Sequence, residues 1–396
     1  MDSLHNDVVI VGAGPSGLAL GAELKRLGVS ARILDRLEAG ENTSRAVVIH
    51  ARTIEVLEPL GVTRELIENG VIVPTFRIRE RGRVLATISF KELETAYPFT
   101  LMLPQDTTEK ILLRRLESLG ATVERPSEVI SIVPGKDNAV VHFRSGGEVV
   151  AIQTKWLVGC DGAHSLLREQ AAIPFEGDAY QESFVLADVE MQWPIDREEV
   201  SLFYSENGLM VVAPLPGSVF HYRVVASVDE APENPDVSEF ERIMSERGPD
   251  KSVAIRRLVW ASRFHIEHRL AKSLRRGRVL LVGDAAHIHS PAGGQGMNTG
   301  IQDGVALASA LQAAVQTGDE EGLAAWQAKR LEVARSVVNF TDRMTRMATL
   351  SSPILKSVRN AAVGIIGHIP LAQHALAKKL AELDTADESA FSLRRG

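Results

Sequence analysis

Three motifs in this chain place glycine or acidic residues directly after apolar runs, and the first is a dinucleotide-binding pattern. Gly12, Gly14 and Gly17 follow the apolar run 8–11, and Asp35 closes the next apolar run. The first glycine of such a motif permits a tight turn, the second lets the backbone approach a pyrophosphate, and the third lets helix and strand pack closely. The following helix N-terminus favours an anion, and an acidic residue accepts hydrogen bonds from ribose hydroxyls. The motif therefore predicts a site for an adenine dinucleotide.

Two further strand ends indicate that the dinucleotide is a flavin. A predicted strand over 156–160 ends in Asp161 and Gly162, and another over 278–282 ends in Gly283 and Asp284. The glycine-dense loop beyond contains Gly293, Gly294, Gly296, Met297 and Asn298. This loop leads into a predicted helix, whose N-terminus can stabilise negative charge on a reduced flavin, while Asp284 suits the ribityl hydroxyls. A nicotinamide needs neither feature, so we expect FAD.

Two features near these motifs could suggest a metal site and a reactive thiol, but we favour neither interpretation. His287 and His289 lie beside Asp284, but no fourth ligand is apparent, so we predict no metal. Cys160, the single cysteine, lies in an apolar run and is expected to be a buried, inert thiol.

Hydrophobic periodicity predicts an α/β protein. A strand over 8–11, a helix over 16–27 and a strand over 31–34 form one βαβ unit. Further helices are predicted over 53–60, 63–69, 105–119 and 297–315, and β-like runs over 129–133, 140–143 and 149–153. Between 183 and 229 strand-like runs recur about every ten residues, which predicts a separate antiparallel sheet. From residue 322 onward the pattern is helical.

These elements predict a doubly wound, Rossmann-like FAD-binding domain with an inserted sheet and a helical C-terminus. We assign 1–75, 100–180 and 275–340 to the FAD-binding domain. Residues 76–99 and 181–274 form the antiparallel β-sheet domain that binds substrate, and 341–396 form the C-terminal helical segment.

The composition and the terminal segments of the chain limit its expected partners and location. The 396 residues include 44 Lys+Arg and 51 Asp+Glu, a net charge of −7, which disfavours nucleic acid as a partner. The N-terminus lacks the pattern of a signal peptide, and the least polar late segment, 361–372, is shorter than the roughly 20 residues that span a bilayer. We expect a cytoplasmic protein without an integral membrane segment, either a monomer or a homodimer.

With these motifs in this order, the chain resembles the FAD-dependent aromatic hydroxylases of the p-hydroxybenzoate hydroxylase type, which are single-component flavoprotein monooxygenases. The motifs are GAGPSG at 12–17, CDGAHS at 160–165 and GDAAHIHSPAGGQGMNTGIQDG at 283–304. SRAVVIHART at 44–53 and QDTTEKIL at 105–112 resemble the branch that hydroxylates phenols and aromatic polyketides.

The resemblance implies roles for individual residues. Arg45 would touch the flavin, Gln105 the ribityl or pyrophosphate region, and Val129 the adenine through its backbone. Asp161 and Gly162 would meet both FAD and a passing NAD(P)H. The complete set of expected cofactor-binding residues is Gly12, Gly14, Gly17, Asp35, Arg36, Arg45, Gln105, Val129, Asp161, Gly162, Asp284, Gly294, Gly296, Met297 and Asn298.

The resemblance also implies a reaction. NADH or NADPH reduces FAD, O2 adds to form a flavin C4a-hydroperoxide, and one oxygen atom passes to an electron-rich aromatic ring. Arg223 and His221 share one face of a predicted strand over 219–226 and are candidates for the substrate pocket, although solvated sheet residues would show the same pattern. Tyr204 and Tyr222 are weaker candidates.

Three alternatives remain open. A flavin-dependent halogenase shares the fold, but the sequence at 192–195 does not match its tryptophan motif. An FAD-dependent reductase would use the same domain without transferring oxygen. A non-enzymatic escort protein is disfavoured because all three cofactor motifs are intact.

The chain departs from the family pattern in two places. Gly304 replaces the alanine that usually follows Gln302 and Asp303, a change expected to loosen the helix. Many members of this branch continue into a thioredoxin-like domain, which we do not expect here because the sequence ends at Gly396.

Overall fold

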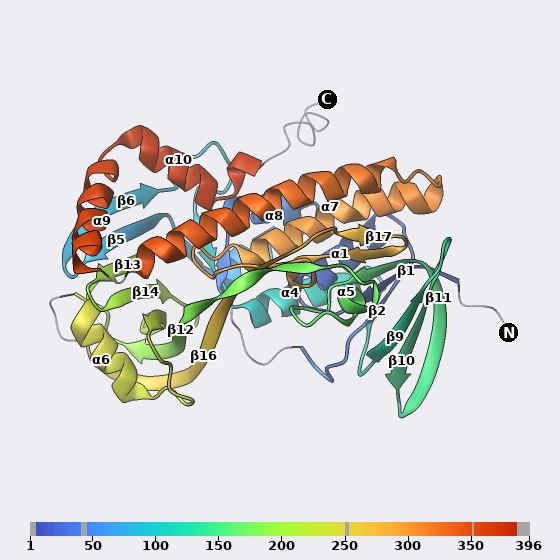
Figure 1. Cartoon of the computed structure of the whole chain (residues 1–396), viewed down its shortest axis with the longest axis horizontal. Coiled ribbons are helices and arrows are strands. Elements are labelled where there is room, and N and C mark those ends of the chain that lie inside the picture. The colour runs from blue at the N-terminus through green and yellow to red at the C-terminus, as the bar shows by residue number, and fades with distance from the viewer. Residues whose placement is uncertain (1–4, 41–45, 250–252, 351, 386–396) are drawn as a thin grey trace.

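The computed structural model describes residues 5–40, 46–249, 253–350 and 352–385. The described residues form two eight-stranded sheets and one three-stranded sheet. The two large sheets lie toward opposite ends of the long axis, and the helices α7 (Gly296–Gln316) and α8 (Glu321–Ala348) run side by side along that axis (Figure 1). Two long strands, β12 (Phe175–Met191) and β16 (Ile255–Ala271), extend from the second sheet toward the first.

The first sheet has the strand order β17-β18-β11-β1-β2-β8, and β9 and β10 extend it beside β11. Its strands are β1 (His5–Val11), β2 (Ala31–Leu34), β8 (Val123–Glu124), β9 (Glu128–Pro134), β10 (Ala139–Ser145), β11 (Glu148–Gly159), β17 (Arg275–Arg276) and β18 (Val279–Leu281). The run from β18 to β8 is parallel throughout. Val8, Val9 and Ile10 have no exposed surface, as expected for a parallel strand covered on both faces.

One difference from the sequence prediction concerns β11. The runs 149–153 and 156–160 were predicted as separate strands, but they form one continuous strand because Thr154 and Lys155 between them do not break it. The first half of β11 pairs antiparallel with β10, and its second half pairs parallel with β1 and β18. A single strand therefore belongs to both the three-stranded meander and the nucleotide-binding core.

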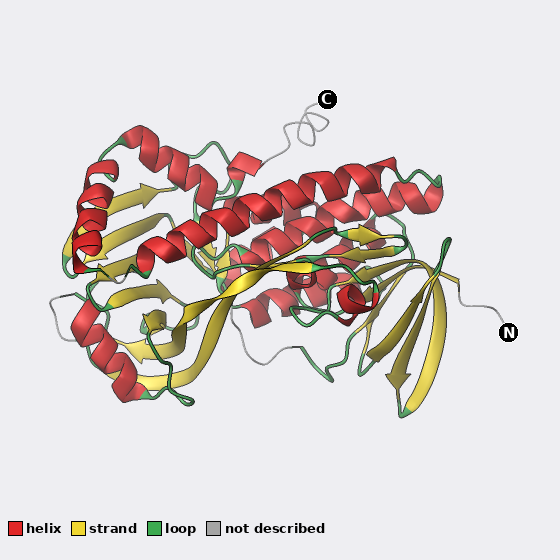
Figure 2. Cartoon of the chain, in the orientation of Figure 1, coloured by secondary structure: helices red, strands yellow, loops and turns green. Residues whose placement is uncertain are grey.

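Helices pack against this sheet (Figure 2). The helix α1 (Pro15–Arg26) packs against α7 and against α4 (Gln105–Ser118). The smaller elements of this half are β3 (Val48–Ile49), α2 (Ala51–Leu57), η1 (Glu58–Leu60), α3 (Thr63–Asn69), β4 (Val71–Val73), β7 (Thr100–Met102), α5 (Leu166–Gln170) and η2 (Gly283–Ala285). The predicted doubly wound α/β domain is confirmed.

Glycines in α7 allow its close approach to α1. A Cβ atom on Gly304 would lie 2.9 Å from the Ser16 carbonyl oxygen, and one on Gly300 would lie 2.4 Å from Ser16 Oγ. The expectation that Gly304 loosens the helix did not include this packing role. Gly304 is the residue that lets the backbones of the two helices pack together.

We expect Gly304→Ala to lower the free energy of unfolding by about 1–3 kcal/mol, because the new methyl group meets backbone that must shift. Gly364→Ala provides the matched control. Gly364 lies in α9 (Pro353–Ile366), where a Cβ would meet no atom within 4 Å, so alanine should stabilise the protein by about 0.5–1 kcal/mol. Urea denaturation of both variants tests the opposite signs. Equal effects in the two variants would contradict the packing argument.

The second sheet has the strand order β19-β16-β12-β15-β14-β13-β5-β6. Its other strands are β5 (Thr75–Glu80), β6 (Arg83–Ser89), β13 (Glu199–Ser205), β14 (Gly208–Pro214), β15 (His221–Val228) and β19 (His287–Ile288). It is not purely antiparallel as predicted, since β13 pairs parallel with β5. The strand predicted over 219–226 begins two residues later, because the His221 amide closes a turn onto the Ser218 carbonyl.

The helix α6 (Val237–Arg247) covers one face of this sheet. The opposite face turns toward the nucleotide-binding half and the C-terminal helices. The C-terminal helices are α8, α9, α10 (Pro370–Leu380) and the short η3 (Leu383–Thr385). Of these, α9 and α10 pack on β6. No helix in the described part of the chain combines the length and apolar character needed to cross a bilayer.

Candidate active site

Five neighbouring parallel strands of the first sheet end at one edge, and the loops that follow them carry charged or glycine residues. Because the carboxyl ends of parallel strands meet at one edge, these loops gather in space, and ligands of such sheets bind there. The loop residues, in strand order from β18 to β8, are Asp284, Asp161, Gly12 to Gly17, Asp35 and Arg125. The sequence predicted all of these except Arg125.

The glycine loop after β1 has the geometry of a phosphate cradle. Gly12 has φ +100°, and a Cβ there would lie 2.2 Å from the Cys160 carbonyl oxygen. A Cβ on Gly17 would lie 2.0 Å from the Gly12 carbonyl oxygen. A Cβ on Gly14, in contrast, would meet no atom within 4 Å. The first and third glycines are therefore required by the fold, whereas the second keeps one side of the loop open to a ligand at the N-terminus of α1.

Asp35 is buried at the end of β2 and fixes this loop. Its Oδ2 accepts a hydrogen bond from the Ala13 amide at 2.6 Å, and its Oδ1 accepts one from the Leu37 amide at 2.8 Å. Each carboxylate oxygen has a second lone pair, so hydrogen bonding to a ribose remains chemically available and stays a prediction. Arg36 next to it is exposed.

Arg125 follows β8 and lies over the same loop. Its Nη2 donates to the Ala13 carbonyl at 3.5 Å, and its Nε lies 3.8 Å from Asp35 Oδ1. That Nε is buried and has no hydrogen-bond partner among the described residues. A buried donor without a partner and an open side at Gly14 both fit an anionic cofactor such as a dinucleotide. The available sequence signal was an arginine at the end of a short strand, which is too common to be specific.

Val129 is brought to the same region by the segment after Arg125. The Ser127 amide donates to the Asp35 carbonyl at 2.7 Å, so β9 begins beside the end of β2. The predicted contact between the Val129 backbone and adenine is compatible with this position and stays a prediction.

The second motif follows β11 and is tied to the third. Asp161 Oδ2 accepts a hydrogen bond from the Leu167 amide at 3.2 Å, and burial raises the pKa of Asp161. Its Oδ1 is buried without a hydrogen-bond partner in the described part of the chain, and Gly162 has φ +83° with open space beside it. Arg168 donates to the Ala163 carbonyl at 2.9 Å and to the Ala285 carbonyl at 3.0 Å. One buried arginine thus holds the two loops together.

The glycine-dense loop before α7 is anchored by Asn298. Asn298 Nδ2 donates to the Val48 carbonyl at 2.8 Å and to the Gly294 carbonyl at 2.7 Å, and its Oδ1 accepts from the His50 amide at 2.8 Å. A Cβ on Gly294 would lie 2.6 Å from the Val48 Cβ. The Asn298 side chain therefore holds the loop against β3, and any contact it makes with FAD stays a prediction.

The remaining predicted residues surround this loop. Asp284 is exposed, Gly296 begins α7, and Met297 packs partly into the core of the first sheet. Arg45 lies outside the described residues. Gln105 Oε1 accepts from the Ala46 amide at 3.5 Å, so the segment directly after Arg45 is held at the N-terminus of α4.

His50 supports the glycine-dense loop and was not among the residues predicted from the sequence. Its Nε2 lies 2.7 Å from the Gly293 carbonyl oxygen and therefore carries the proton that it donates. The ring is completely buried, and this burial lowers the pKa of His50 to about 4. A neutral imidazole thus supports the glycine loop over the ordinary pH range.

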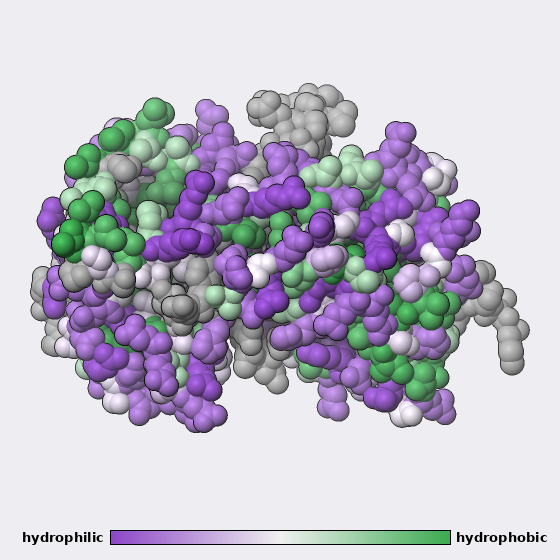
Figure 3. Space-filling view, in the orientation of Figure 1, coloured by the Kyte–Doolittle hydropathy of each residue, from purple (hydrophilic) through white to green (hydrophobic). Residues whose placement is uncertain are grey.

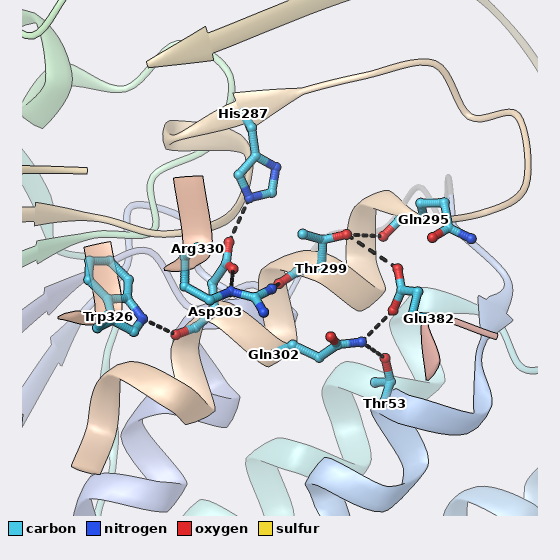
Figure 4. A network of polar contacts seen from close by, with 9 residues as sticks. All are labelled: Thr53, His287, Gln295, Thr299, Gln302, Asp303, Trp326, Arg330 and Glu382. Atoms are coloured by element: carbon cyan, nitrogen blue, oxygen red, sulfur yellow. Dashed lines mark hydrogen bonds and ion pairs between the residues drawn. The ribbon is translucent and has the colours of Figure 1, made fainter. Parts of the chain in front are cut away.

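A buried polar network lies behind the loop along α7 (Figure 4). Asp303, 1% exposed, forms an ion pair with Arg330 from α8 and lies 2.6 Å from His287 Nε2. Its carbonyl accepts a hydrogen bond from Trp326 Nε1 at 3.1 Å. Burial opposes ionisation of Asp303, but the charge of Arg330 and the hydrogen bond to His287 outweigh it and lower the pKa of Asp303. His287 therefore bonds to Asp303, and no cluster of three or more potential metal ligands occurs among the described residues.

Glu382 joins the C-terminal segment to this network (Figure 4). Its Oε2 accepts a hydrogen bond from Gln302, which also donates to Thr53 Oγ1 at 2.9 Å. Thr299 Oγ1 lies 3.0 Å from the Gln295 carbonyl oxygen and 3.3 Å from Glu382 Oε1. The single hydroxyl hydrogen of Thr299 is shared between these two acceptors. Burial raises the pKa of Glu382 to about 8.

We expect the stability of the protein to fall as the pH rises from about 4.5 to about 8, in part because of Glu382. Its pKa is higher in the folded than in the unfolded state, so the folded state binds the extra proton and loses this advantage as the pH rises through about 8. Glu382→Gln keeps the hydrogen bonds without the titration. Unfolding free energies measured by urea denaturation from pH 5 to pH 9 should show the variant gaining on the wild type up to about pH 8 and running parallel to it above, with a total gain on the order of a few kcal/mol. Profiles that are parallel over the whole pH range would contradict a neutral Glu382.

The two substrate-pocket candidates share the face of β15 that points away from α6. Arg223 is 2% exposed and donates to Asp188 Oδ1 at 2.7 Å and Oδ2 at 2.9 Å. His221 Nδ1 lies 3.0 Å from the Pro216 carbonyl oxygen, and its Nε2 is buried without a hydrogen-bond partner among the described residues. Tyr222 points to the opposite face, where it packs in the same cluster as residues of α6. Tyr204 is buried beneath Arg359 of α9.

A family model described as "FAD binding domain" matches residues 5–341. The chain belongs to this FAD-binding family. A curated relative, 6-methylpretetramide 4-monooxygenase from Streptomyces rimosus, is 35% identical over 353 residues, which cover 88% of this chain and 63% of the relative. Pentachlorophenol 4-monooxygenase from Sphingobium chlorophenolicum is 32% identical, with 85% of this chain and 64% of the relative covered. The chain thus spans less than two thirds of the length of these two relatives.

A solved structure supports the same fold. The crystal structure of p-nitrophenol 4-monooxygenase from Pseudomonas putida DLL-E4 superposes with a TM-score of 0.86 at 23% identity. The match covers 96% of this chain and 98% of that chain. The FAD-binding α/β fold expected from the three motifs is confirmed, including the second sheet and the C-terminal helices.

Proposed function

We propose that this FAD-binding protein is a monooxygenase that uses NADH or NADPH and O2 to hydroxylate an aromatic substrate, either phenolic or polycyclic. The observation that carries the proposal is the convergence of three cofactor loops at the carboxyl edge of β18, β11 and β1, next to the N-terminus of α7. Two relatives are named as monooxygenases, and the name of one of them specifies a phenol.

The residues present fit FAD. Gly14 leaves room for the pyrophosphate, and Arg125 offers an unsatisfied buried donor beside it. Asp284, at the exposed end of β18, would hold ribityl hydroxyls. When bound, FAD would supply the redox chemistry, namely the acceptance of two electrons from NAD(P)H and the activation of O2. The protein supplies binding, orientation and the exclusion of water.

The N-terminus of α7 contributes electrostatically to the reaction. The first amides of α7, beginning with Gly296 and Met297, have no partners within the helix, and no side chain in the described part of the chain caps them. Their partial positive charge would stabilise the anionic form of the reduced cofactor. Asn298 and His50 hold these amides in place through the contacts with Val48 and Gly293.

The second sheet would bind the substrate through the face that carries Arg223 and His221. Because Asp188 already compensates the charge of Arg223 with two hydrogen bonds, this face favours a neutral phenol over a carboxylate. The unsatisfied Nε2 of His221 would bond to the phenolic hydroxyl. Closure of the sheet over the ring would exclude water, so that oxygen is transferred to the substrate and is not lost as hydrogen peroxide.

Oxygen-18 labelling tests the proposal. In the balanced reaction, one aromatic substrate, one O2, one NAD(P)H and one proton give the hydroxylated product, NAD(P)+ and water. Phenols and polycyclic aromatic compounds are first screened for stimulated NAD(P)H oxidation, which identifies a substrate. With that substrate under ¹⁸O2, we expect one labelled oxygen atom in the product. Label from water, a chlorinated product in the presence of chloride, or undiminished turnover without O2 would instead indicate hydration, halogenation or reduction. A purified protein that takes up no flavin would favour the non-enzymatic alternative.

A further inference from the structure

The helices α9 and α10 carry a large exposed apolar surface, to which the proposed reaction assigns no role. Six of the sixteen large apolar side chains that are exposed in the described part of the chain lie between residues 354 and 371. They are Ile354, Leu355, Val358, Ile365, Ile369 and Leu371. In the space-filling view, apolar residues gather over α9 and α10 at one end of the molecule (Figure 3). Monomeric proteins rarely expose such a concentration without a partner.

The opposite faces of both helices are already satisfied by the protein. Val363 packs on the cluster that contains Tyr204, and Gly367 lies so close to β6 that a Cβ would meet Ala86 at 2.3 Å. Ala377 and Leu380 are buried against residues from both halves of the protein. The exposed set is therefore a second apolar face that the fold itself does not use. Exposure is high at the turn between the helices, where Ile365 is 69% and Leu371 is 79% exposed, and at the start of α9, where Ile354 is 76% exposed.

The charge of this region identifies the kind of partner. The segment 353–380 contains Lys356, Arg359, Lys378 and Lys379 and no acidic residue, in a chain whose net charge is −7. The neighbouring β5–β6 turn adds Arg81 and Arg83, both exposed. Some of this charge is compensated, since Lys379 pairs with Asp384, Lys356 donates to the Glu206 carbonyl and Arg359 is buried. The exposed basic residues that remain near the apolar surface are Lys378, Arg81 and Arg83.

We propose that α9 and α10 bind the surface of an anionic lipid bilayer, with the apolar turn between them inserted among the lipid headgroups. An exposed apolar face bordered by lysine and arginine is the arrangement by which amphipathic helices bind anionic membranes without crossing them. A second copy of the chain fits less well. A two-fold interface places the same surface on both sides, so it would bring two surfaces of the same charge together and add no acidic residues of a different partner.

The turn is built to insert without refolding. Gln373 Nε2 donates to the Gly367 carbonyl, and His368 Nδ1 hydrogen-bonds to the Gly364 carbonyl. Both contacts satisfy backbone groups that would otherwise lose water on entering the headgroup region. The packing of Gly367 against β6 fixes the turn to the second sheet. Binding therefore needs no ordering of the segment, and the bilayer would lie at the end of the protein formed by that sheet.

Vesicle flotation of the FAD-loaded protein tests the proposal. We expect the wild type to float with vesicles of phosphatidylcholine containing about 30% phosphatidylserine and much less with phosphatidylcholine alone, and to dissociate near 1 M salt. Ile365→Glu with Leu371→Glu should reduce the bound fraction about tenfold or more. The matched control replaces two exposed valines on the opposite end of the protein, Val133→Glu with Val149→Glu, and should bind as the wild type does.

A milder variant and a second measurement keep the result decisive. Lys378→Glu should weaken binding a few-fold without affecting the apolar face, and flavin absorbance confirms that each variant is folded. A wild type that does not float with anionic vesicles overturns the proposal, as does equal binding of the wild type and the double variant at 365 and 371. Light scattering that shows a dimer for the wild type and a monomer for that variant would assign the surface to a second copy.

Discussion

Gly14→Val is expected to give a folded, colourless protein whose affinity for FAD is reduced by about 100-fold or more, which corresponds to roughly 3 kcal/mol. A side chain at Gly14 meets no protein atom within 4 Å, and its φ of −74° is accessible to valine, so the fold should tolerate it. The same space is where the pyrophosphate must approach the backbone at the N-terminus of α1. Flavin absorbance after reconstitution and titration of the apoprotein with FAD measure the loss.

Two other glycines make this experiment specific. Gly364→Val places the same side chain in open space on α9, away from the cradle, and should leave FAD binding unchanged. Gly12→Ala should fail to fold, because its φ is +100° and its Cβ would lie 2.2 Å from the Cys160 carbonyl oxygen. If Gly14→Val bound FAD as tightly as Gly364→Val, the loop after β1 would not be the pyrophosphate site.

Four of the site residues predicted from the sequence share one property, namely that each follows directly or closely on the end of a parallel strand. An apolar run followed by glycine or aspartate identifies Gly12, Asp35, Asp161 and Asp284 locally, and the geometry of a parallel sheet brings such ends together without further information. Alternation along a strand likewise placed His221 and Arg223 on one face correctly. These inferences needed only neighbouring residues and the period of a helix or strand.

The parts that sequence missed depend on contacts between distant segments. Glu382 meets Gln302, which is 80 residues away in the chain, and nothing near either residue marks it as a partner. The pairing of Asp188 with Arg223 requires the register of β12 against β15, which the sequence does not encode in any short pattern. The packing role of Gly304 was missed for the same reason, since its close neighbour Ser16 belongs to the first motif, nearly 300 residues earlier in the chain.

Arg330→Met is expected to lower the free energy of unfolding by about 3–5 kcal/mol, because it leaves the charge of Asp303 buried without its cation. Arg64→Met removes the same charge from an ion pair with Glu68 on the surface, where the arginine side chain is 90% exposed, and should leave stability almost unchanged.

Adding Asp303→Asn to Arg330→Met should recover much of the loss, since the uncompensated charge is then removed while His287 retains a hydrogen-bond acceptor. Urea denaturation of the FAD-saturated proteins gives the double-mutant cycle, and FAD titration follows the function. Because Asp303 lies on α7 and Arg330 also reaches the Thr299 carbonyl near its N-terminus, the single variant should weaken FAD binding as well, and the double variant should partly restore it. If Arg330→Met cost no more than Arg64→Met, the ion pair would not stabilise the helix that presents its amides to the cofactor.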